Sequence, residues 1–171
     1  MNLKKALVLL TFCLTFCLIP LESSSQEQVL ALPIQGLSPR DALSQYLAPM
    51  TEYGSGHRGI DLPAVVGDEV ISPASGKISF IGKVGYRNVI SVRFGNSFTA
   101  SLEPVCSESL EGSLVNIGDP IGFVCEPDPE YIWHCTQSCI HFGTRSEQGY
   151  FSPLALMGEL SPSRLVFYAR G

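Results

Sequence analysis

The chain has 171 residues, of which 16 are glycine and 12 are proline, and only 16% are charged while 45% are apolar. Coiled coils and disordered acidic tails carry far more charge, so both are excluded, and the length suits one domain with a sizeable core. A net charge of −5 argues against nucleic acid as a partner, because phosphate binding needs a basic surface. The composition predicts a turn-rich β domain.

The first 25 residues have the pattern of an export signal. Two lysines precede an almost wholly apolar stretch at residues 6–21, and small side chains at Ser23 and Ser25 suit a cleavage site. The stretch is marginal as a membrane span, which needs about 20 apolar residues. We therefore expect residues 1–25 to be a signal peptide and the protein to be secreted or to lie at the cell wall, outside the cytoplasm. The alternative is an uncleaved N-terminal segment that anchors the protein in a membrane.

We expect the segment after the signal, residues 26–49, to be a lead-in to the main domain. Ser38 and Pro39 suit the N-cap and first position of a helix, which predicts a short amphipathic helix over Ser38–Tyr46. We expect residues 50–160 to form a β domain and residues 161–171 to form a C-terminal tail.

Short β-branched runs bounded by glycine, asparagine or proline dominate the middle of the chain. They are Glu69–Ser72, Lys77–Ile81, Asn88–Phe94, Phe98–Leu102, Ile121–Cys125 and Ile140–Gly143. Lys77–Ile81 and Asn88–Phe94 alternate, which predicts one buried and one solvated face. The pattern Gly-Asp-x-Val/Ile occurs at Gly67–Val70 and Gly118–Ile121, and each copy leads into a predicted strand. We expect an all-β fold, an antiparallel β-sheet core of a lipoyl-like or duplicated hybrid type with long loops.

Four cysteines lie beyond the signal: Cys106, Cys125, Cys135 and Cys139. An even number of cysteines in an oxidising compartment predicts disulfides. Three pairings are possible, and Cys106–Cys125 with Cys135–Cys139 is favoured because each closes a local loop. The alternative is a cysteine metal site, which oxidising conditions disfavour.

Two of the three histidines suggest a metal site. His57 and Asp61 lie four residues apart, and His141 stands in an apolar run, where an imidazole needs a polar partner or a metal. Imidazole and carboxylate groups bind zinc, and a catalytic zinc uses three protein ligands and a water. The alternative for His141 is a core histidine with a hydrogen-bond partner.

These motifs together resemble the lysostaphin/LytM-type zinc endopeptidases, which cut peptidoglycan cross-bridges. The similarity runs colinearly from about Ala48 to Gly158 and includes Gly56–Leu62, the two Gly-Asp strands and Ile140-His141-Phe142. The resemblance implies Zn²⁺ as cofactor, with His57, Asp61 and His141 as ligands. It also implies a peptidoglycan peptide or the cell wall as partner.

The chain departs from this family at two positions. The family motif His-x-His reads Cys139-Ile140-His141 here, and Tyr-Ala-His-Leu reads Thr99-Ala100-Ser101-Leu102. In the family those two histidines assist the metal-bound water and steady the developing oxyanion. Loss of a positioned acid or base lowers a rate about 10²–10⁴-fold, so the catalytic pair is degenerate at Ser101 and Cys139.

Two other residues are candidates to replace the missing histidines. Glu103 shares a strand face with Ser101, because residues two apart point the same way. His134 would approach the metal if a Cys135–Cys139 disulfide folds its loop back. The alternatives are a solvated rim charge at Glu103 and a surface residue at His134.

The sequence therefore predicts a secreted zinc metalloendopeptidase of the peptidoglycan hydrolase type, with its usual catalytic histidines replaced. The alternative is a catalytically inactive module of the same fold that binds the cell wall or activates another cell-wall hydrolase. A third reading is a plain lipoyl-like structural domain whose histidines are coincidental. In each case we expect a monomer.

Overall fold

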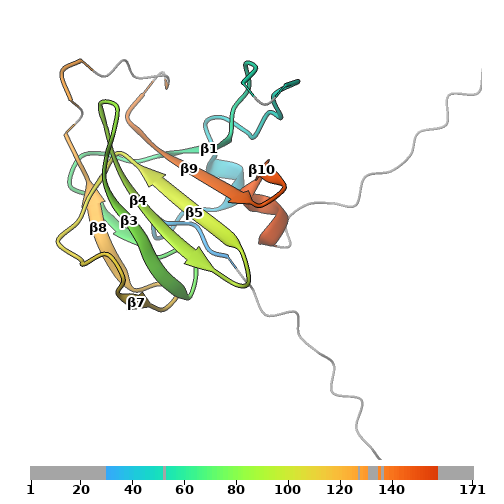
Figure 1. Cartoon of the computed structure of the whole chain (residues 1–171). Helices are drawn as coiled ribbons and strands as arrows, with labels where there is room; N and C mark the ends of the chain where they lie inside the picture. Colours follow the sequence, from blue (N-terminus) through green and yellow to red (C-terminus); the bar gives the residue numbers. More distant parts are fainter. Residues whose placement is uncertain (1–29, 52, 127, 131–134, 136, 158–171) are drawn as a thin grey trace, which may run out of the picture.

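The computed structural model describes residues 30–51, 53–126, 128–130, 135 and 137–157 (Figure 1). Over these ranges the chain is almost entirely β, and the expected antiparallel all-β fold is confirmed. The predicted signal peptide (1–25) and tail (161–171) lie outside the described residues. Within the described residues, no helix is long and apolar enough to cross a membrane.

Ten strands and two short 3₁₀ helices make up the described part of the chain. They are η1 (Pro39–Asp41), β1 (Gly59–Pro63), β2 (Glu69–Ile71), β3 (Gly76–Val84), β4 (Arg87–Phe94), β5 (Phe98–Glu103), β6 (Val105–Cys106), β7 (Leu114–Val115), β8 (Pro120–Val124), β9 (Cys139–Ser146), β10 (Gly149–Phe151) and η2 (Pro153–Leu156). All six predicted strands are present, with ends shifted by up to three residues.

The strands form two antiparallel sheets. The larger has the order β1-β9-β5-β4-β3-β7, with β10 also paired to β9 (Figure 1). The smaller has the order β2-β8-β6. Strand β9 has three partners in the larger sheet, since β1, β5 and β10 all pair with it. Strand β1 was not predicted, because its glycine and proline ends weaken the local signal and its pairing along β9 supplies the ladder.

The two faces of the larger sheet have different roles. Residues such as Ile90, Leu102 and Phe142 are buried in a core that also includes Val70 and Ile121 of the smaller sheet. The opposite face carries the residues at alternate positions, and it forms the floor of a cleft.

The expected solvated face of Asn88–Phe94 is wrong for half of its length. Val89 and Ser91 point away from the core but are only 6% and 7% exposed. They line the cleft together with side chains from neighbouring strands, which leave little of either side chain exposed to solvent.

The predicted helix over Ser38–Tyr46 is wrong beyond Asp41. The N–H and Oγ of Ser38 donate to Asp41 Oδ2 at 2.7 and 2.8 Å, and these bonds hold the pKa of Asp41 below its ordinary value. The next residues pair with the chain around β1 instead of continuing a helix. Leu43 N–H donates to Asp61 O, and Leu47 exchanges two backbone hydrogen bonds with His57. This pairing holds the segment before β1 in place.

Both favoured disulfides are present. Cys106–Cys125 joins β6 to the residue that follows β8, and Cys135–Cys139 closes a loop onto the first residue of β9. The cysteine metal site is therefore excluded for these four residues.

Candidate metal centre

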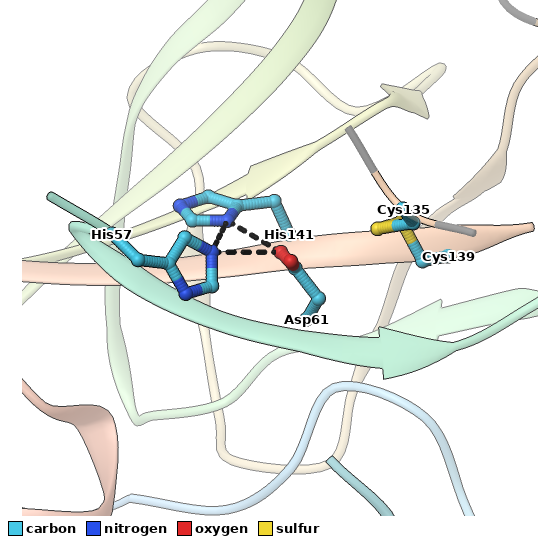
Figure 2. Close-up of a disulfide and its surroundings, with 5 residues drawn as sticks. All are labelled: His57, Asp61, Cys135, Cys139 and His141. Atoms are coloured by element: carbon cyan, nitrogen blue, oxygen red, sulfur yellow. Dashed lines mark hydrogen bonds and ion pairs between the residues drawn. A yellow bond between two sulfur atoms is a disulfide. The ribbon is translucent and has the colours of Figure 1, made fainter. Parts of the chain in front are cut away.

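Three polar side chains converge where β1 and β9 run side by side. Asp61 of β1 lies directly opposite His141 of β9 in the strand register, so both side chains project from the same face. His57 precedes β1 and is held by its backbone pairing with Leu47. Figure 2 shows the three side chains pointing toward one another beside the Cys135–Cys139 disulfide.

The ligand atoms of these residues form a tight triangle. His57 Nε2 lies 3.0 Å and His141 Nδ1 lies 2.8 Å from Asp61 Oδ1, and the two nitrogens are 3.2 Å apart (Figure 2). Ligands 2.0–2.1 Å from a tetrahedral zinc ion are about 3.3 Å from one another. The spacing of the triangle is close to what such an ion requires.

The hydrogen bond behind His57 fixes the role of its ring. Nδ1 lies 2.8 Å from the carbonyl oxygen of Gln45, and because that oxygen only accepts, Nδ1 carries the proton. In the neutral ring Nε2 then presents a lone pair to Asp61 and His141. A lone pair and a carboxylate oxygen at this distance repel unless a proton or a cation lies between them. Two imidazole nitrogens and a carboxylate oxygen are a donor set that suits zinc.

Gly59 makes room for the ring of His141. A Cβ atom at Gly59 would lie 2.7 Å from both Cε1 and Nε2 of that ring, and it would also collide with the carbonyl oxygen of Phe142. Any other residue at this position would displace the ring or the strand. The glycine in the His57–Asp61 motif is therefore a steric requirement of the site.

The triangle stands at the wall of a cleft of about 860 Å³. The side chains of His57 and His141 are 20% and 16% exposed, whereas that of Asp61 is 1% exposed. The lining residues are Gly56, His57, Arg58, Ser79, Phe80, Val84, Arg87, Val89, Ser91, Arg93, Thr99, Ser101, Glu103, His141, Gly143, Thr144, Arg145 and Tyr150. A substrate in this cleft would meet the histidines directly.

Neither of the degenerate family positions offers a group that titrates near neutral pH. Ser101 lines the cleft, and its Oγ lies 2.8 Å from Ser91 Oγ in a hydroxyl–hydroxyl hydrogen bond. Cys139 is 1% exposed and bonded to Cys135. Proton transfer at this site would therefore need another residue.

Glu103 lines the cleft on the same face as Ser101. It lies directly opposite His141 in the register of β5 and β9. Its side chain is 13% exposed and makes an ion pair with Arg87, so it is not a solvated rim charge. His134, the other candidate, lies outside the described residues.

Several cleft residues were not singled out from the sequence: Arg87, Arg93, Arg145 and Tyr150. They come from β4, β9 and β10, and only the cross-strand register brings them to one face. Arg58, which does belong to the motif, donates to the carbonyl oxygen of Gly54 at 3.2 Å. Its guanidinium lies 5.7 Å from the centre of the Tyr150 ring, and both residues line the cleft.

Comparison with known sequences identifies one family. The profile of peptidase family M23 matches residues 55–153, which contain all three residues of the triangle. The uncharacterized protein Rv2891 of Mycobacterium tuberculosis is 29% identical over 132 residues, a match that covers 74% of this chain and 51% of that protein. The uncharacterized protein Mb2915 of Mycobacterium bovis matches to the same extent. This chain thus spans about half the length of the curated relatives it matches.

Comparison with solved structures shows the same fold. A zinc-containing peptidase from Vibrio cholerae superposes with a TM-score of 0.57 at 18% identity, covering 72% of this chain and 38% of that one. The catalytic domain of lysostaphin from Staphylococcus simulans superposes with a TM-score of 0.55 at 21% identity, covering 67% of this chain and 90% of that domain. At these identities the likeness is one of fold.

Proposed function

This chain belongs to peptidase family M23, and from that premise we propose that it is an exported zinc metalloendopeptidase that hydrolyses peptide cross-bridges of peptidoglycan. The observation that carries the proposal is the triangle of His57 Nε2, Asp61 Oδ1 and His141 Nδ1, with edges of 2.8–3.2 Å, at the wall of an open cleft. Family membership supports a zinc-dependent peptide hydrolase. Export and cross-bridge cleavage rest on the N-terminal pattern and on the motif resemblance.

Zinc held by His57, Asp61 and His141 would supply Lewis-acid chemistry, polarising a carbonyl group and lowering the pKa of water to about 7. The protein's own contribution begins with orientation. The Gln45 carbonyl oxygen accepts a hydrogen bond from Nδ1 of His57 and so fixes the tautomer of that ring. Such a bond, made by the ring nitrogen that does not bind the metal, typically raises metal affinity about 10–100-fold. Asp61 is almost wholly buried, so its carboxylate would neutralise part of the charge of a bound cation in a setting where water screens little.

The group that we assign to proton transfer is Glu103. Its carboxylate borders the cleft opposite His141 in the strand register and pairs with the guanidinium of Arg87, and a carboxylate oxygen at the edge of a site is a group that can accept a proton. Ser101 cannot do this at neutral pH, and the sulfur of Cys139 is bonded to Cys135. His134 stays a second candidate on the grounds given from the sequence.

The second candidate function is a non-catalytic module that binds peptidoglycan or activates another cell-wall hydrolase. The observation that favours it is the chemistry at the two degenerate positions, a hydrogen-bonded hydroxyl at Ser101 and a disulfide at Cys139. Under this alternative the cleft binds peptide without cutting it, whether the triangle holds zinc or stays metal-free.

The test uses the full chain, its histidine variants and purified peptidoglycan. We expect about one zinc per chain by elemental analysis, and release of new amino termini that a chelator stops and added zinc restores. His57→Ala and His141→Ala should lose both. Glu103→Gln should keep the zinc and lower the rate about 10²–10⁴-fold.

Glu69→Gln is the matched control, because Glu69 is an exposed carboxylate on β2, away from the cleft. It should leave zinc content and rate unchanged. Stoichiometric zinc with sedimentation on peptidoglycan but no release would overturn the enzyme and support the binding module. A chain that binds no zinc would overturn the enzyme, and one that also fails to sediment on peptidoglycan would overturn the peptidoglycan-binding module.

A further inference from the structure

The cleft beside the triangle is unusually rich in arginine for this protein. The whole chain has a net charge of −5, yet the cleft lining includes four arginines and a single carboxylate, that of Glu103. Arg87 is paired with Glu103, and Arg58 lies against Tyr150. Arg93 and Arg145 remain, and neither makes an ion pair with another described residue.

The strand register places these two arginines in one row across the sheet. Arg93 of β4 and Arg145 of β9 both lie opposite Thr99 of β5, one on each side of it. Lys77 of β3 lies opposite Arg93 and extends the row beyond the cleft. All three cations are exposed. We call Lys77, Arg93 and Arg145 the cationic row.

The cationic row runs parallel to the row that holds the metal triangle. Asp61, His141 and Glu103 are neighbours across the same sheet, and Arg145 is four residues beyond His141 on β9. Four residues of a strand span about 13 Å. An extended peptide covers this distance in about four residues. Fewer residues are needed when the peptide's acidic side chain and the arginine side chain extend toward each other.

The floor between the two rows carries only glycine and serine, so no large side chain rises from it. The residues opposite one another there are Gly59, Gly143, Ser101 and Ser91. A Cβ atom at Gly143 would lie 3.1 Å from the carbonyl oxygen of Arg58 and 3.5 Å from His141 Nε2, so a larger residue would crowd both the strand edge and that ring. An extended backbone can therefore lie over this floor, with one end at the triangle and the other at the cationic row.

We propose that the cleft selects an acidic peptide, one that places a carboxylate on Arg93 and Arg145 while a peptide bond a few residues away lies at the triangle. Arginine binds carboxylates through paired N–H donors, and such charge-assisted bonds are stronger than neutral ones. This inference rests on the proposed function, because it adds a substrate feature to the same cleft. It assigns Arg93 and Arg145 to substrate binding and specificity.

The test measures binding of two fluorescent peptides that differ only in one residue, glutamate in one and glutamine in the other. The full chain is used with zinc and, in parallel, with chelator, and fluorescence anisotropy gives both dissociation constants. We expect the glutamate peptide to bind about fivefold more tightly at low salt, as suits ion pairs in a partly open cleft. The preference should shrink as salt rises.

Variants locate the preference. Arg93→Gln/Arg145→Gln should bind the two peptides equally, whereas Arg93→Lys/Arg145→Lys should keep part of the preference because the charge stays. Arg40→Gln is the control, since Arg40 is exposed in η1 and does not line the cleft. Equal binding of both peptides to the unaltered chain would overturn the proposal, and so would a preference that survives in the double glutamine variant.

The two experiments separate the acidic-peptide site from the proposed peptidase activity. A glutamate preference that persists without zinc-dependent release of amino termini would remove the enzyme and leave the acidic-peptide site. Chelator-sensitive release of amino termini without any glutamate preference would overturn the acidic-peptide site and leave the enzyme.

Discussion

The triangle of His57, Asp61 and His141 is held by backbone pairing as well as by its side chains. His57 exchanges two backbone hydrogen bonds with Leu47, and Asp61 N–H donates to the carbonyl oxygen of Ser44. The ring of His57 is fixed by the neighbouring Gln45 carbonyl. Residues 44–47 therefore brace two of the three ligands from outside the sheet.

At this scale we predict the effect of Gly59→Ala. The added Cβ would press on the His141 ring, 2.7 Å away, and on the carbonyl oxygen of Phe142. We expect zinc affinity to fall about 10–100-fold, as when the support of a ligand is lost, and the metal-free protein to lose about 1–3 kcal/mol of unfolding free energy. Competition with a zinc-binding dye and urea unfolding measure the two effects separately.

Gly82→Ala is the control for crowding. The nearest atoms to its Cβ would be those of the Phe80 ring, the first at 3.1 Å, and that ring is not part of the triangle. It should keep the zinc affinity of the unaltered chain. If Gly59→Ala binds zinc as tightly as Gly82→Ala, the steric role of Gly59 is wrong.

At the scale of elements, β9 aligns two of the three triangle residues with other residues of the cleft. It aligns His141 with Asp61 of β1 on one side and with Glu103 of β5 on the other. Further along, Arg145 lies opposite Tyr150 of β10. The first residue of β9, Cys139, is covalently bound to Cys135, so the strand that carries His141 is also anchored at its start.

The two disulfides close loops of different length, and this predicts their relative contributions to stability. The paired residues are 19 positions apart in Cys106–Cys125 and 4 apart in Cys135–Cys139. The entropy of loop closure gives about 3 kcal/mol for the longer loop and about 2 kcal/mol for the shorter one. Urea unfolding of the two alanine double variants should therefore rank Cys106→Ala/Cys125→Ala as the less stable.

These variants are well matched, because each pair has one buried and one half-buried cysteine. The reverse ranking would mean that contacts around Cys139, rather than loop length, dominate. Zinc affinity should change more in Cys135→Ala/Cys139→Ala, since only that pair adjoins His141.

At the scale of the whole molecule, the triangle joins segments that are far apart in the sequence. His57 and His141 are separated by 84 positions, and β1 and β9 meet only through the tertiary fold. A ligand that binds the folded chain and not the unfolded one stabilises it by mass action, by about 2.7 kcal/mol at a hundred times its dissociation constant.

We therefore predict that zinc raises the melting temperature. For a chain of this size that free energy corresponds to a rise of about 5–10 °C, measured by circular dichroism with and without chelator. His141→Ala should show no zinc-dependent shift. An equal shift in that variant would place the stabilising zinc elsewhere.

Local sequence patterns predicted most of the strands but not the backbone pairing that holds the segment before β1 beside the site. The runs around Lys77–Ile81, Asn88–Phe94 and Phe98–Leu102 combine β-branched residues with flanking turns, and all became strands. The helix over Ser38–Tyr46 failed because Leu43 and Leu47 pair with residues of the His57–Asp61 segment. An N-cap pattern indicates where a helix can begin. Where this helix ends depends on hydrogen bonds to residues 57 and 61, which the local pattern does not contain.

The sequence by itself determined the chemical identity of the candidate ligands, the all-β fold and the favoured cysteine pairs. These features depend on patterns that span only a few residues: a spacing of four between two ligands, glycine at tight positions, and short β-branched runs. Such patterns can be recognised without knowing the tertiary fold. Only the tertiary structure decided that Glu103 pairs with Arg87, that Ser101 pairs with Ser91, and that Arg93 and Arg145 lie in one row. Those contacts depend on cross-strand register between segments as much as 52 positions apart, which is fixed by packing of the whole sheet rather than by any local preference.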